Sequence, residues 1–214
     1  MNKEIFTRKE NWRGSYYELA MELQPSHDDV RLERALLAVW SHPNLSGHWL
    51  NLESYGQTPD VFRVTELVNN GSNIAYVNLY GIFLVPEVNQ QIGCLSVVVR
   101  ENNGSDWLDF CFPSAMLESA FSVKYPLVHD ENSWLSIVDK YLLEIADTVY
   151  RQTPYDLALI GDEVSGMAHK ISITATEIEN GGVFLSPALW DKISPNQGFQ
   201  VMPSGLRWAT FAQQ

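Results

Sequence analysis

Residues 93–112, GCLSVVVRENNGSDWLDFCF, predict two β-strands joined by a tight turn. Apolar residues dominate residues 93–101 and 107–112, and the NNGS between them has the asparagine and glycine that hairpin turns favour. So short a link makes the two strands antiparallel neighbours. The second strand carries a carboxylate, Asp109, in an otherwise apolar run. A carboxylate is unexpected in a strand that is buried on both faces, so Asp109 needs an explanation.

Further strands extend this hairpin into a meander. Residues 69–72 repeat the NNGS turn, so the strands on either side of them are expected to pair. Residues 15–23 alternate between apolar and mixed side chains, as a strand with one buried face does. The expected strands are residues 15–23, 61–67, 74–85, 93–101, 107–112, 156–161 and 170–178, with a terminal hairpin of residues 199–202 and 206–210.

Two amphipathic helices are expected beside these strands. One covers residues 28–41 and ends at His42-Pro43, because the residue before a proline disfavours helical angles. The other covers residues 132–151, where apolar residues recur at helical spacing. Outside these elements we expect a short helix over residues 114–121, a loop over residues 43–59 and a mobile or loosely packed start over residues 1–13.

Together these elements predict a single α+β domain over residues 1–214. Its largely antiparallel sheet has five or more strands. Both main helices pack on one face of that sheet, because this arrangement buries their apolar stripes. A content of 45% hydrophobic residues is sufficient for the core that such a domain requires.

The alternation of side chains along each strand sorts the residues by sheet face. One face is apolar and should meet the helices; it is expected to include Leu95, Val97 and Val99. The other, which we call the mixed face, combines aromatic, polar and charged side chains and is similar to the lining of a binding surface. The candidate binding residues on the mixed face are Glu18, Asn78, Tyr80, Arg100, Trp107 and Asp109.

A covered mixed face would give the same pattern. The C-terminal strands and the loop of residues 43–59 would then lie over it, and Asp109 would pair with Arg100 or accept backbone hydrogen bonds, as a buried carboxylate must. The mixed face could also be catalytic, with Glu18 and either Asp109 or Glu22 as the carboxylate pair of a small hydrolase. That chemistry needs two carboxyl groups about 5–10 Å apart with separated pKa values.

The balance of charge limits the partners. A net charge of −12, from 26 acidic and 14 basic residues, disfavours nucleic acid and membranes and favours a basic protein partner. No cofactor or metal is expected, since Cys94, Cys111, His42 and His48 lack the spacing of a metal site. The first residues lack the apolar core of a signal peptide, so a cytoplasmic location is expected.

Three segments carry a resemblance. Residues 11–23 (NWRGSYYELAMEL), 106–110 (DWLDF) and 159–161 (LIG) are similar to stand-alone bacterial cytoplasmic proteins of uncharacterised function, a resemblance that implies no catalytic residues. In size, acidity and α+β pattern the chain also resembles the bacterial immunity proteins that neutralise toxins. The second resemblance implies a protein partner.

We therefore expect a non-enzymatic, acidic protein-binding module of the immunity type that uses the mixed face or its loops. The small hydrolase is the alternative, and no catalytic residue is assigned. A structural protein, or a homodimer joined through an edge strand near the terminal hairpin, is the third interpretation.

Overall fold

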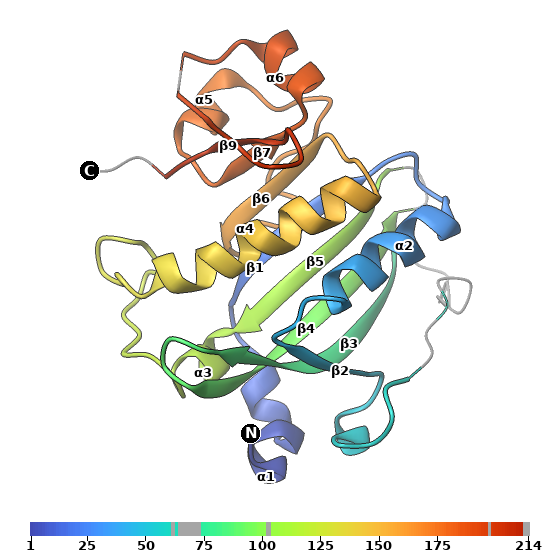
Figure 1. The fold of residues 1–214 in the computed structure, drawn as a ribbon, viewed down its shortest axis with the longest axis vertical. Helices are drawn as coiled ribbons and strands as arrows, with labels where there is room; N and C mark the ends of the chain where they lie inside the picture. The colour runs from blue at the N-terminus through green and yellow to red at the C-terminus, as the bar shows by residue number, and fades with distance from the viewer. Residues whose placement is uncertain (61–62, 64–73, 102–103, 197, 212–214) are drawn as a thin grey trace.

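A computed structural model describes residues 1–60, 63, 74–101, 104–196 and 198–211. The strands in these ranges are β1 (Tyr16–Leu23), β2 (Leu45–Trp49), β3 (Ile74–Val85), β4 (Gln90–Glu101), β5 (Asp106–Pro113), β6 (Leu157–Asp162), β7 (Val183–Leu185), β8 (Gln200–Val201) and β9 (Arg207–Ala209). Within the described residues they form one nine-stranded sheet in the order β2-β3-β4-β5-β1-β6-β7-β9-β8, and neighbours run antiparallel (Figure 1). The predicted α+β class with five or more antiparallel strands is confirmed.

Two long helices lie across the same face of this sheet, as predicted (Figure 1). They are α2 and α4, which contact each other and, respectively, β5 and β1. The Asp28 side chain caps the start of α2 by accepting a hydrogen bond from the backbone N–H of Arg31. The helices are α1 (Lys3–Thr7), η1 (Lys9–Trp12), α2 (Asp29–Trp40), η2 (Leu52–Ser54), α3 (Ser114–Leu117), α4 (Leu135–Gln152), α5 (Ala175–Glu179) and α6 (Pro187–Ile193), where η denotes a 3-10 helix.

Two predicted elements differ from the structure. Residues 170–178 were expected to be a strand, but they form a loop and most of α5. Thr174 and Glu177 make a capping box there, which favours a helix start over the alternating pattern. The expected loop of residues 43–59 contains β2 and η2, and β2 pairs with β3. The predicted strand over residues 61–67 falls largely outside the described residues.

The start of the chain packs closely against the mixed face. Phe6 and Trp12 are 0% and 6% exposed and contact each other edge to face. Trp12 also packs edge to face on Tyr80 of β3. The expectation of a loosely packed start therefore does not hold for these residues, because their aromatic side chains cover apolar surface of the sheet.

The predicted terminal hairpin is confirmed as β8 and β9. It lies at the end of the sheet opposite to β2, with β8 outermost. The expected homodimer contact through such an edge strand remains a prediction.

The sheet faces follow the predicted sorting except in β4. On the helix face, the core includes Leu19, Leu79 and Phe110. In β4, however, Cys94 and Val98 belong to this core, whereas Leu95 and Val97 pack on the mixed face. Both faces of β4 carry apolar residues, and the helix face also carries the polar Arg100, so alternation alone assigned the faces wrongly. The register is set by the β3–β4 hairpin, in which Val85 pairs with Gln90.

We expect Gly81→Ala to destabilise the fold by about 1–3 kcal/mol, because the added methyl group would overlap the Trp40 indole where α2 packs on β3. The free energy of unfolding, measured by urea denaturation, tests this. Gly198→Ala is the matched control, since no described atom beyond its chain neighbours lies within 4 Å of the added methyl group. Equal stability of the two variants would contradict the close packing of α2 on β3.

Candidate functional site

Five of the six predicted site residues share the mixed face, but Arg100 lies on the opposite face. Its guanidinium donates two hydrogen bonds to Asp106, at 2.8 and 2.9 Å, and one to Asp29 at 2.7 Å. These bonds join the start of α2 to the start of β5. The expected pair of Arg100 with Asp109 is therefore wrong, and the cause is the same misassignment of the faces of β4.

A loop of residues 163–173, the covering loop, lies over the centre of the mixed face. The backbone N–H of Ser165 donates to Glu18 Oε1 at 2.8 Å, and the Ser165 hydroxyl donates to Asp109 Oδ2 at 2.9 Å. One residue thus bridges both carboxylates. Glu18 and Asp109 are only 5% and 4% exposed, so neither forms part of an open surface.

The same loop covers the other end of β1. The backbone N–H of Lys170 donates to Glu22 Oε2 at 2.7 Å, and the Ser105 hydroxyl donates to Glu22 Oε1 at 2.5 Å. The His169 ring packs edge to face on Trp107, which is also buried. The centre of the mixed face is therefore covered and not open. The cover is the loop of residues 163–173, whereas the sequence analysis expected the C-terminal strands and the loop of residues 43–59.

Burial shifts the acid–base properties of these carboxyl groups. It raises the pKa of Asp109 well above its usual range, and the nearby Glu18 carboxylate raises it further. Burial also raises the pKa of Glu18, although the hydrogen bond from Ser165 opposes the shift. Asp109 Oδ1 has no hydrogen-bond partner among the described residues. Such a pair resembles the carboxyls that the hydrolase alternative requires, but the covering loop leaves no access for a substrate.

We expect Asp109→Asn to stabilise the protein at neutral pH, by about 1–4 kcal/mol, because a neutral side chain of the same shape replaces a buried acid. A raised folded-state pKa means that the contribution of Asp109 to stability is intact below its unfolded pKa and is lost as pH rises through its folded pKa. The gain should therefore be small near pH 4 and should grow toward pH 8. Urea denaturation across this range measures it.

Asp130→Asn is the control, since Asp130 is exposed. It should change the free energy of unfolding little at any pH. A destabilised Asp109→Asn variant at pH 8 would show that the charged form of Asp109 stabilises the fold and that the pKa is not raised.

The uncovered part of the mixed face lies on β3. Tyr76 is 68% exposed, and Asn78 and Tyr80 are half-buried. Tyr80 lines a small cavity of about 320 Å³ with two basic residues of the N-terminal segment, Lys9 and Arg13, and one acidic residue, Glu53. This region is therefore polar and partly basic, which does not suit a basic partner.

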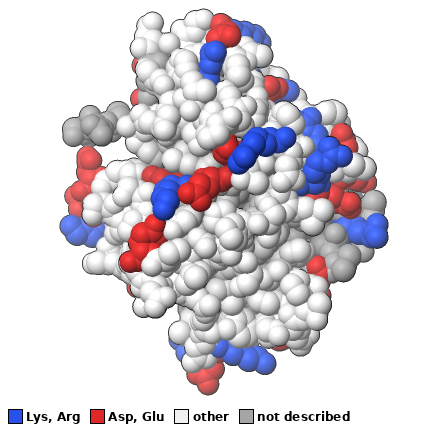
Figure 2. Space-filling model, viewed as in Figure 1, with Lys and Arg blue, Asp and Glu red and all other residues white. Residues whose placement is uncertain are grey.

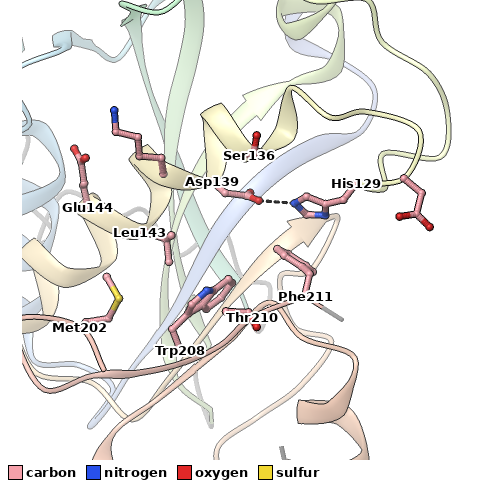
Figure 3. Close-up of a pocket in the computed structure, with 11 residues that line it drawn as sticks. His129, Ser136, Asp139, Leu143, Glu144, Met202, Trp208, Thr210 and Phe211 are labelled. Carbon is pink, nitrogen blue, oxygen red and sulfur yellow. Dashed lines mark hydrogen bonds and ion pairs between the residues drawn. The ribbon is translucent and has the colours of Figure 1, made fainter. Parts of the chain in front are cut away.

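A larger opening lies on the other side of the molecule, between α4 and the terminal hairpin (Figure 3). We call it the groove; its volume is about 770 Å³, which is within the range of ligand sites. Figure 3 shows side chains of α4 along one wall and Met202, Trp208 and Phe211 on the other. The lining residues are His129, Asp130, Ser136, Asp139, Lys140, Leu143, Glu144, Met202, Trp208, Thr210 and Phe211.

One carboxylate of the groove is already satisfied. Asp139 accepts a hydrogen bond from the Tyr17 hydroxyl at 2.7 Å and lies 2.5 Å from His129 Nε2 (Figure 3). Asp139 is a charged residue outside the apolar stripe of α4, yet it is buried. Asp139 therefore positions His129, whose ring packs on Phe211 at 4.2 Å, and this contact closes one end of the groove.

The remaining charges of the groove are mainly acidic. Figure 2 shows charged side chains gathered in a band over α4. Asp130 is exposed and has no ion-pair partner among the described residues. The Glu144 side chain is 49% exposed, and its Oε2 lies 3.3 Å from His42 Nε2, which leaves the other oxygen for a ligand. The one lysine of the lining, Lys140, binds Glu87 at 3.1 Å, so its charge is largely neutralised. The groove thus combines an apolar floor with accessible carboxylates.

Sequence reasoning missed the groove. His129 and Asp130 stand in a polar segment, and Lys140 and Glu144 lie outside the apolar stripe of the predicted helix, so none of them is among the predicted site residues. Neither segment taken alone indicates a groove, because the second wall comes from a hairpin some sixty residues later. The available signal was the aromatic content of that hairpin, with Trp208 and Phe211.

Within the described residues, no three side chains of His, Cys, Asp or Glu converge in a way that could hold a metal ion. In the same part of the chain, no helix is long and apolar enough to cross a membrane.

No protein-family model and no curated protein matches this sequence. One solved structure is similar: the toxic C-terminal tip of CdiA from Pseudomonas aeruginosa in complex with immune protein. The matched chain is 13% identical with a TM-score of 0.43, and the match covers 70% of this chain and 88% of that one. Values this low place neither chain in the family of the other.

Proposed function

We propose that this protein is a non-enzymatic, acidic module that binds a basic protein, and that its docking surface includes the groove. The observation that carries the proposal is the groove itself, which has an apolar floor of Leu143, Met202 and Trp208 beneath accessible carboxylates. Protein interfaces have this composition, with an apolar centre and a polar rim. The net charge of −12 adds an attractive field for a basic partner.

An immunity role is the specific form of this proposal. Such a protein neutralises a toxin by occupying its surface, so it needs no catalytic group of its own. The buried position of Glu18 and Asp109 supports this form over the hydrolase, because their carboxyls lie beneath the covering loop. The expected setting is the bacterial cytoplasm.

We expect Glu144→Lys to abolish capture of the partner. Wild-type protein should retain a stoichiometric basic protein from native lysate at about 50 mM salt and lose most of it at about 500 mM, where screening shortens the range of the attraction. The reversed charge should prevent capture at both salt concentrations. Expressed alone, the partner should inhibit growth, and co-expression of the wild-type chain should restore it.

Glu53→Lys is the matched control, because Glu53 is an exposed carboxylate outside the groove. It changes the net charge equally and should retain the partner. If both lysine variants bind as the wild type does, the groove is not the docking surface. If no basic partner is retained at low salt, the binding module itself is refuted.

A further inference from the structure

We propose that the groove takes an extended segment of the partner in which two basic side chains flank an apolar one. This inference rests on the proposed function and specifies its chemistry. Three features of the groove lead to it: carboxylates at two separate places, an apolar floor between them, and a length that matches a short extended chain.

The carboxylates lie toward different ends of the groove. Asp130 follows His129, which is bound to Asp139 on the first half of α4. Glu144 lies farther along the same helix, and Figure 3 shows Glu144 and His129 on opposite sides of the opening. Ser136 and Glu144 line the groove roughly two turns apart, about 12 Å along the helix axis. The α4 wall of the groove is therefore longer than a single ion pair.

The floor between these two places is apolar. Leu143 and Met202 are half-buried, and Trp208 is buried behind them against Phe184. An aliphatic side chain bound here would be removed from water, and so would the apolar surface of the groove that it covers, which favours binding. The floor therefore suits an apolar side chain between the two basic ones.

The length of the α4 wall, about 12 Å between Ser136 and Glu144, sets the spacing of the basic residues in the proposed segment. In an extended chain, alternate side chains point the same way, and residues four apart are separated by about 13 Å. Two basic residues at that spacing match the length of the α4 wall and would point toward Asp130 and Glu144, while the residue between them faces the apolar part of the lining. Arginine suits both ends, because its guanidinium forms paired hydrogen bonds with carboxylates and its stem packs on apolar surface.

The rest of the groove does not compete with these cations. Lys140 is held by Glu87, and its ammonium lies 5.0 Å from the centre of the Tyr141 ring. Asp139 already has Tyr17 and His129 as partners. Glu144 Oε2 lies 3.3 Å from His42 Nε2. The acceptors left for a ligand are therefore the Asp130 carboxylate and the second oxygen of Glu144.

A capped five-residue peptide tests the proposal directly, with arginine at the first and last positions, leucine in the middle and glycine elsewhere. Its binding to the full chain is measured by NMR shift perturbation. We expect shifts at residues 129–144 and 202–211, and affinity at least about tenfold higher than for the same peptide with citrulline, which keeps the shape of arginine without its charge. Equal affinity for the two peptides, or no binding of either, would overturn the proposal.

Protein variants locate the contact. Glu144→Gln and Asp130→Asn should each weaken the arginine peptide about fivefold or more, whereas Glu53→Gln should leave its affinity unchanged. All three sites are exposed, so the variants should fold as the wild type does. If Glu53→Gln weakens binding as much as Glu144→Gln does, the attraction is non-specific and the groove assignment fails.

The outcomes for the peptide and for the protein partner can be told apart. If the peptide binds in the groove but no basic protein is retained, the chemistry of the groove stands and the proposed function fails. If a basic protein is retained and the peptide does not compete with it, the proposed function stands and the inferred segment is wrong.

Discussion

The pairing of β1 with β5 on one side and β6 on the other is the constraint on which the rest of the structure depends. It joins the meander of the first half of the chain to the strands of the second half. On the helix face, β1 contributes apolar side chains such as Leu19 to the main core. On the mixed face it carries Glu18 and Glu22, which need hydrogen-bond donors once they are buried. The loop after β6 supplies them, so the pairing of β1 and the position of this loop are fixed together.

Elements whose signals lie within a few neighbouring residues could be predicted from the sequence. The stripe of α4, the alternation in β1 and the turn of the terminal hairpin are local patterns of this kind. The face assignment of β4 depends instead on its register with β3, and residues 170–178 offered two local patterns at once. There the capping box of Thr174 and Glu177 outweighs the alternation, because it satisfies backbone N–H groups at the start of α5.

For the site residues, too, the sequence predicted what depends on local patterns and missed what depends on distant segments. The sequence correctly brought Glu18, Trp107 and Asp109 to one face, because the period of the strand requires it. It could not show that this face is covered, since part of the cover is bound through backbone N–H groups, which every residue except proline has. The groove was equally hidden, because its walls meet only after the hairpin packs beside α4.

The two walls of the groove also differ in how firmly they are held. One is α4, a helix of 18 residues whose apolar stripe is buried in the main core. The other is a hairpin joined to the sheet edge by three residue pairs between β7 and β9 and closed by two between β8 and β9. Short pairing at an edge opens locally at the lowest free energy. Under the proposed function, a groove with one firm and one yielding wall would tolerate differences in side-chain size and discriminate chiefly by charge. Variants of the proposed basic segment that keep their cations would then still be accommodated.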